Sequence, residues 1–208
     1  MKCQPDFYEN IKSQDILWFV SQLNNKSICE KLLKSSFMVS DVDGSLTDAG
    51  VYVSADGEGG RNFSTIDGYV VQHAISSGLT IALVSGKYNL STRIRGLRLG
   101  IPDELCIAGV KDKVNLINNL CEKYKLSFSQ ILVFGDDYLD TKIKKDIPEI
   151  IFACPLNAPF YFYHMADLVL PKPGGQHAFR LLVDLVLYVQ KKHFAQDIIS
   201  QALKVYKV

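Results

Sequence analysis

Short apolar segments alternate with helical segments along the chain, and this alternation constrains the fold more than any other feature. The runs "FMVSDV" (37–42), "LTIALVSG" (79–86), "ELCIAG" (104–109) and "SQILVFGDD" (129–137) predict strands, and "EIIFAC" (149–154) and "ADLVLP" (166–171) are weaker examples. The second run is continuously apolar, as a strand buried on both faces is. Helices are expected between them, near 68–77, 89–99, 111–125 and 138–146, with a last one at 177–192. The pattern predicts an α/β fold, a Rossmann-like parallel sheet with helices on both faces.

Two segments depart from this alternation. Residues 1–35 predict a helical N-terminal extension, because Ile16, Phe19 and Leu23 in "DILWFVSQL" recur at helical spacing. Residues 49–68 predict a β-hairpin, since "VYV" alternates and "ADG" offers an Asp-Gly turn. We therefore expect an extension at 1–35, a core at 36–192 with the hairpin at 49–68, and a C-terminal tail at 193–208.

The balance of charges excludes some classes of partner. The 208 residues contain 23 Lys and Arg against 22 Asp and Glu, which gives a net charge of +1 and no electrostatic footprint for nucleic acid or an anionic membrane. No run of about 20 apolar residues predicts a membrane span. The five scattered cysteines form no C-x-x-C pair and favour a reduced, cytoplasmic protein: Cys3, Cys29, Cys106, Cys121 and Cys154.

Polar side chains follow four of the predicted strands, at the point where each strand ends. Because the carboxyl ends of parallel strands meet at one edge of a sheet, we expect these side chains to lie close together. The residues concerned are Asp41, Asp43, Ser85, Gly86, Lys87, Lys111, Lys113, Gly135, Asp136, Asp137 and Asp140.

These residue types favour phosphate chemistry. Asp41 and Asp136 would repel one another unless a divalent cation lay between them, and Mg²⁺ prefers such hard oxygen ligands. A lysine and the backbone N–H groups near Gly44 and Gly86 can bind phosphate oxygens. Asp41 is a candidate nucleophile that forms an aspartyl-phosphate, and Asp43 a candidate acid and base.

Some assignments stay open at this point. Lys111 competes with Lys113 for the phosphate. Ser85 can begin the next helix as its N-cap while also binding phosphate. Asp137 and Asp140 can cap the helix that follows them, and for Asp140 capping or support is favoured over direct metal ligation.

Four motifs occur in a fixed order along the chain: D-x-D-G-S-L-T-D, a strand ending in S-G, a lysine, and G-D-D-x-x-D. This order resembles the haloacid dehalogenase (HAD) superfamily of phosphatases. The resemblance covers about residues 36–190. It implies that Asp41 is the nucleophile and Asp43 the general acid and base. It implies phosphate binding by Ser85 and Lys113, and Mg²⁺ binding by Asp41, the Asp43 carbonyl and Asp136, with support from Asp137.

"DGSLTDAGVYVSADGEGGRNFSTIDG" and "PGGQHAFRLLVDLVL" resemble the capless branch that contains 3-deoxy-manno-octulosonate 8-phosphate and sialate 9-phosphate phosphatases. That resemblance implies a phosphorylated acidic sugar as substrate. It also implies a homotetramer in which a neighbouring subunit, through a segment such as residues 193–208, helps cover each site.

The sequence departs from this branch around the substrate. Lys87 replaces the usual arginine, Ile66 replaces the arginine of R-D-G, and the last motif keeps Arg180 but has His177 for glycine and Leu181 for glutamate. Tyr69, where the sialate enzymes tend to have lysine, leans toward the octulosonate side. Substrate candidates are therefore Lys87, Arg93, Tyr69 and Arg180.

Two rival functions remain. A catalytically silent tetramerisation domain, like those fused to CMP-sialate synthetases, would keep the fold without turnover. A phospho-receiver domain also clusters aspartates, a hydroxyl and a lysine, but its acidic pair precedes the phosphorylated aspartate, and here D-x-D comes first.

Overall fold

A computed structural model describes residues 14–55 and 57–205. Its main sheet has six strands in the order β5-β4-β1-β6-β7-β8, and each neighbouring pair is parallel. The strands are β1 (Phe37–Asp41), β4 (Thr80–Ser85), β5 (Cys106–Ala108), β6 (Ile131–Phe134), β7 (Ile151–Cys154) and β8 (Leu168–Val169). The predicted Rossmann-like α/β fold is confirmed.

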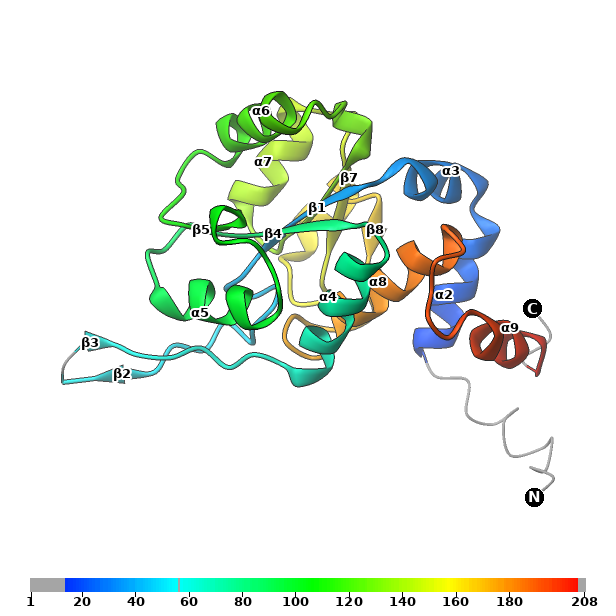
Figure 1. The fold of residues 1–208 in the computed structure, drawn as a ribbon, viewed down its shortest axis with the longest axis horizontal. Coiled ribbons are helices and arrows are strands. Elements are labelled where there is room, and N and C mark those ends of the chain that lie inside the picture. The colour runs from blue at the N-terminus through cyan, green and yellow to red at the C-terminus, as the bar shows by residue number, and fades with distance from the viewer. Residues whose placement is uncertain (1–13, 56, 206–208) are drawn as a thin grey trace, which may run out of the picture.

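Helices cover both faces of this sheet (Figure 1). Figure 1 places α6 (Lys113–Tyr124) and α7 (Tyr138–Asp146) on one face, and α4 (Thr65–Ser76), α5 (Leu90–Arg98) and α8 (Ala178–Val189) on the other. Short 3-10 turns lie at Asp103–Leu105, Phe128–Gln130 and Phe160–Met165. Every residue of β1, β6 and β7 is buried, because helices cover both faces of these strands.

Side-chain caps fix where the helices begin, which places the loops at the sheet edge. Ser64 accepts a hydrogen bond from the N–H of Asp67 at the start of α4, and Asp112 accepts one from Asn115 at the start of α6. Asp137 and Asp140 form a capping box at the start of α7. These caps satisfy N–H groups that have no partner inside the helix.

The hairpin in the structure is shorter than the one that the sequence predicts. β2 (Val53–Ser54) and β3 (Gly57–Glu58) pair over two residues each and project from the body of the molecule (Figure 1). A single bridge between Thr47 and Phe63 closes the base of the hairpin. Residues 65–68, expected in the hairpin, belong to α4, because the Ser64 cap begins the helix earlier.

The N-terminal helices α2 (Gln14–Asn24) and α3 (Lys26–Lys34) dock on the core. The indole Nε1 of Trp18 donates to the carbonyl of Val169 at 2.7 Å. The side-chain amide of Gln190 donates to the carbonyls of Leu32 and Ser35. The extension is thus tied to both the edge strand β8 and the end of α8.

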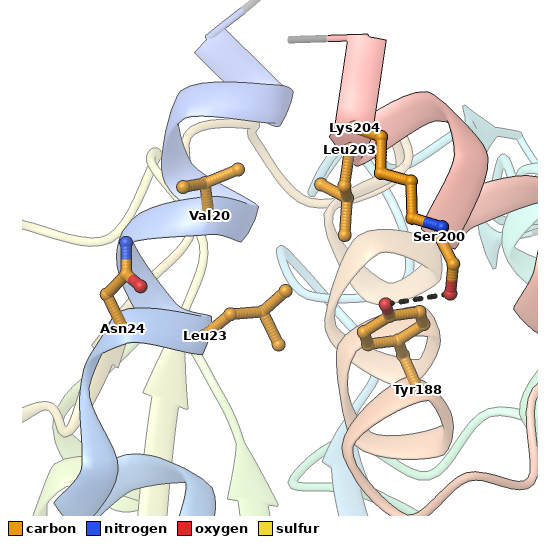
Figure 2. Close-up of a pocket in the computed structure, with 7 residues that line it drawn as sticks. All are labelled: Val20, Leu23, Asn24, Tyr188, Ser200, Leu203 and Lys204. Atoms are coloured by element: carbon orange, nitrogen blue, oxygen red, sulfur yellow. Dashed lines mark hydrogen bonds between the residues drawn. The ribbon is translucent and has the colours of Figure 1, made fainter. Parts of the chain in front are cut away.

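The C-terminal segment contains a helix that the sequence analysis did not predict, α9 (Gln196–Val205). A hollow of about 520 Å³ separates α9 from α2, with Tyr188 of α8 at its floor and a hydrogen bond between Tyr188 and Ser200 (Figure 2). In the described part of the chain, no helix is long and apolar enough to cross a membrane, and its four cysteines are free.

Candidate active site

The carboxyl ends of the central strands deliver the acidic residues to one hollow, as the sequence predicts. Asp41 is the last residue of β1 and pairs in register with Val84 of β4, one residue before Ser85. The hollow has a volume of about 230 Å³. Its lining residues are Asp41, Asp43, Gly86, Lys87, Lys113, Asp136, Asp137, Tyr138, Leu139 and Asp140.

Lys113 joins two buried carboxylates at the floor of this hollow. Its Nζ lies 2.6 Å from Oδ1 of Asp41 and 2.7 Å from Oδ1 of Asp140. Burial alone would lower the pKa of Lys113, but the charges of Asp140 and Asp41 raise it above its ordinary value. Lys111, its rival in the sequence analysis, is exposed and does not line the hollow. The structure therefore places Lys113, and not Lys111, beside the candidate nucleophile.

Three carboxylates gather closely enough to hold a metal ion. One oxygen each from Asp41, Asp136 and Asp140 lies within 4.8 Å of the others. Burial, followed by the charge of Asp140, raises the pKa of Asp41 well above its ordinary value and that of Asp136 to about 6. Lys113 pairs with Asp41 and Asp140 but not with Asp136, and a divalent cation fits the remaining negative charge of the cluster.

Asp140 differs from the other two members of this cluster. Its Oδ1 accepts from Lys113, and its side chain also caps the N–H of Asp137 at the start of α7. The Asp43 carboxylate is not one of the three clustered carboxylates.

The Asp43 side chain is held by two donors. The Nε of Arg61 donates to Oδ1, and the Ser85 hydroxyl donates to Oδ2 at 3.1 Å. The Ser85 oxygen in turn accepts the N–H of Lys87 at 3.1 Å. Ser85 is thus within hydrogen-bond distance of the candidate acid and at the start of the loop that carries Gly86 and Lys87.

The loop after β1 approaches Asp136 closely. Ser45 donates to Oδ1 of Asp136 at 3.0 Å, and a Cβ on Gly44 would lie 2.1 Å from Oδ2 of Asp136. The N–H of Gly44, expected to bind phosphate, donates to Thr47 at 3.3 Å. Glycine at position 44, with φ of 96°, therefore serves the close approach and the turn.

A second loop, "PGG" (173–175), packs against the loop after β1. A Cβ on Gly174 would lie 1.9 Å from the carbonyl oxygen of Gly44. The Asn157 side chain donates to that carbonyl at 2.9 Å and accepts the N–H of Gly174 at 2.6 Å. Asn157 therefore joins the two loops by hydrogen bonds to the backbone of each.

Comparison with known proteins places this geometry in a family. No family model matches the chain. The 3-deoxy-D-manno-octulosonate 8-phosphate phosphatase of Haemophilus influenzae is 30% identical over 183 residues, which are 86% of this chain and 97% of that protein. The chain belongs to the 3-deoxy-D-manno-octulosonate 8-phosphate phosphatase family. It is thus a member of a family of phosphoric monoester hydrolases.

Solved structures agree with this family membership. The 3-deoxy-D-manno-octulosonate 8-phosphate phosphatase of Moraxella catarrhalis, in complex with magnesium ion, phosphate ion and KDO, is 25% identical with a TM-score of 0.73 and covers 85% of this chain and 97% of its own. A HAD superfamily hydrolase from Legionella pneumophila, 24% identical, shares the fold with a TM-score of 0.76 over 89% of this chain and 98% of its own. The chain thus has the fold that the resemblance to the HAD superfamily implies.

The structure separates the four residues expected to recognise the family's sugar substrate. Lys87 lines the hollow, but the other three do not. Arg93 pairs with Asp103 on the exposed surface of α5, Nε to Oδ1 at 2.5 Å. The guanidinium of Arg180 pairs with Asp184 and lies over the rings of Tyr69 and Phe194. Arg93, Tyr69 and Arg180 thus have partners outside the hollow within this chain.

Sequence reasoning missed Arg61, Ser45 and Asn157. Asn157 lies outside the recognised motifs, and Arg61 lies in a recognised segment to which no role was assigned. Only their three-dimensional contacts reveal them. Asp48, which the motif contains, has a structural role: its carboxylate accepts from the N–H of Gly50 and from the Asn62 side chain. Asp48 thereby holds the two arms of the hairpin together at their base.

Proposed function

We propose that this chain is a magnesium-dependent phosphatase that hydrolyses a phosphorylated acidic sugar, 3-deoxy-D-manno-octulosonate 8-phosphate, through an aspartyl-phosphate. The observation that carries the proposal is the arrangement of the buried Asp41 and Lys113 with the half-buried Asp136, with the Asp43 carboxyl in the same hollow. The names of the family members, which include a complex with magnesium, phosphate and KDO, support the choice of ion and substrate.

The residues divide the chemistry between them. Asp41 attacks the phosphorus, and its Oδ2 is the candidate attacking atom because Lys113 engages Oδ1. Asp43 protonates the leaving oxygen as the phosphorus–oxygen bond breaks, so the sugar leaves as an alcohol. The Asp43 carboxylate then takes a proton from water as the water attacks the aspartyl-phosphate, which frees phosphate and restores Asp41.

The phosphate needs cationic partners during both steps. Lys113, with the Ser85 hydroxyl and the loop N–H groups near Gly86, would bind its oxygens. Asp41, Asp136 and the Asp43 carbonyl would hold Mg²⁺, supported by Asp137 and Asp140. When bound, Mg²⁺ supplies positive charge that screens the phosphate from the carboxylates.

Phosphate release across a panel of substrates tests the proposal. The panel contains octulosonate 8-phosphate, a nonulosonate 9-phosphate and simple hexose phosphates, each with magnesium and with a chelator. We expect the octulosonate to be hydrolysed with the highest kcat/KM, and only with magnesium. Asp41→Asn should abolish release, whereas Lys142→Ala on the exposed face of α7 should not change it.

Two other results would redirect the proposal. If the nonulosonate 9-phosphate is hydrolysed with the highest kcat/KM, the chain is a sialate-type 9-phosphate phosphatase instead. Absence of release from every substrate, by a folded protein of tetrameric mass, would favour the silent tetramerisation domain.

We also propose that the chain is a cytoplasmic homotetramer in which a neighbouring subunit contributes to each site. The projecting hairpin supports this assembly, because its apolar side chains Tyr52 and Val53 are 64% and 73% exposed. The native mass of the purified protein tests the tetramer, and Val53→Asp should lower that mass if the hairpins associate. Cell fractionation tests the location.

A further inference from the structure

Arg61 is a buried cation held against a residue of the candidate site. It lies in the arm that leads from the hairpin back to α4, 18 residues after Asp43. None of its side chain is exposed, whereas the Asp43 side chain is 22% exposed. Its Nε–H donates to Oδ1 of Asp43. A buried guanidinium without an anionic partner is costly, so the ion pair fixes both side chains.

The backbone around Arg61 is fixed on several sides. Thr47 and Phe63 form the bridge at the base of the hairpin, and Asn62 donates to Asp48. Asn89, the N-cap of α5, donates to the carbonyl of Gly59 at 3.4 Å. The direction of the Arg61 side chain is therefore set by the loop after β1, by the hairpin and by α5.

The two oxygens of the Asp43 carboxyl have unlike partners. Oδ1 accepts from the buried, planar guanidinium of Arg61, which has N–H donors and no acceptor. Oδ2 accepts from the Ser85 hydroxyl at 3.1 Å, which can rotate toward an arriving phosphate. Oδ2 is thus the oxygen that can lose its partner and exchange a proton with the substrate.

We propose that Arg61 is a positioning residue that orients Asp43 for proton transfer. This inference rests on the proposed phosphatase function. With Arg61 on Oδ1, the proton on Oδ2 passes to the bridging oxygen as the phosphorus–oxygen bond breaks. The same Oδ2 later accepts the proton of the attacking water. Arg61 acts only through Asp43 and makes no bond to the reacting atoms.

The test compares two substrates that differ in their need for an acid. An alkyl sugar phosphate needs a proton on its leaving oxygen, whereas p-nitrophenyl phosphate does not. In Arg61→Met we expect kcat for the sugar phosphate to fall about 100-fold, within the usual range for acid–base catalysis, with KM changed less than twofold. With p-nitrophenyl phosphate the variant should still release one p-nitrophenol per site in a burst, followed by slow hydrolysis of the aspartyl-phosphate.

Further variants separate positioning from a structural role. Arg61→Lys should recover part of kcat, and added guanidinium ion should recover part of kcat in Arg61→Ala. In an Asp43→Asn background, Arg61→Met should cause no further loss, because residues that act as one unit are non-additive. Lys142→Ala, which removes an exposed pair with Asp146, is the matched control and should keep wild-type kcat.

Several outcomes would overturn this inference. It would be overturned if folded Arg61→Met kept the wild-type kcat, or if only its KM rose. It would also be overturned if the burst of p-nitrophenol were lost, or if the effects of Arg61→Met and Asp43→Asn on kcat were additive. If Arg61→Met does not fold, the same comparison is made with Arg61→Lys, where unchanged kcat for the sugar phosphate overturns the inference. Wild-type enzyme that hydrolyses neither substrate would refute the proposed function itself, whereas active wild type with active Arg61→Met refutes only the role of Arg61.

Discussion

The Nζ atom of Lys113 lies 2.6 Å from Oδ1 of Asp41, and both side chains are more than nine-tenths buried. Because Lys113 also contacts Asp140, its ammonium offsets two carboxylates that the fold has taken out of water. The pair thus links the stability of the sheet edge to the chemistry of the candidate nucleophile.

Lys113→Met should lower both stability and activity. Removing one partner of a buried ion pair leaves an uncompensated charge and costs about 3–5 kcal/mol. We expect urea unfolding to show that loss, and phosphate release to fall by at least about 100-fold. Lys111→Ala, two residues away on the surface, is the control and should change the free energy of unfolding by less than about 0.5 kcal/mol. Equal effects of the two variants would contradict this assignment.

Magnesium should raise the thermal stability of the wild-type protein. An ion that binds only the folded state stabilises it by about 1.4 kcal/mol at ten times its Kd. The shift in melting temperature should be absent or much smaller in Asp136→Asn, because one of the clustered carboxylates is lost. Calcium and sodium chloride at the same ionic strength serve as controls. A full magnesium shift in Asp136→Asn would place the ion elsewhere.

Gly174→Ala should disrupt the site without touching an acidic residue. The new Cβ would lie 1.9 Å from the carbonyl oxygen of Gly44, so the loop after β1 must move. We expect kcat to fall by about 10-fold or more, since small displacements of catalytic groups are costly. Gly60→Ala is the matched control, because its Cβ would meet nothing within 4 Å. The two variants are compared by phosphate release and by thermal melting.

Asp167→Asn should lower stability in a manner that depends on pH. Burial alone would raise the pKa of Asp167, but hydrogen bonds from Lys31, the Phe152 N–H and Lys144 lower it below its ordinary value. A lowered pKa in the folded state adds stability above the unfolded pKa near 3.8, and this contribution is lost as the pH falls through the lower folded value.

The wild-type free energy of unfolding should therefore exceed that of Asp167→Asn by about 1–3 kcal/mol at pH 7. The difference should shrink as the pH drops below about 4. Denaturant unfolding at pH 7, 5 and 3 measures it. A difference that stays constant over this range would show that the charge of Asp167 is not its source.

The sheet and its acidic edge could be predicted because both follow local rules. Buried strands read as apolar runs, and the residues after Asp41, Ser85 and Phe134 converge wherever parallel strands do. Arg61 and Asn157 could not be predicted in this way, because their partners lie 18 and 113 residues away and no local pattern marks the pairing. The helix α9 was also missed, since a short amphipathic segment after a longer helix reads equally well as a tail.

Ion pairs with nearby acids engage two of the substrate candidates. Arg93 and Arg180 are basic residues near recognised motifs, but each meets an acid on the same element or the next one. The directions of these two side chains depend on Asp103 and Asp184. The distance of each arginine from a motif along the sequence does not reveal these ion pairs.

The contact of Asn157 with Gly44 has a consequence for synthesis on the ribosome. The chain emerges from its N-terminus, so the loop that carries Asp41 and Asp43 is made long before Asn157, 113 residues later, and before the "PGG" loop that follows. Until those residues emerge, the carbonyl of Gly44 lacks the amide that holds it. A nascent chain halted before residue 157 would carry the candidate nucleophile in an unfinished loop, so we expect this site to be completed only after Asn157 and Gly174 have emerged.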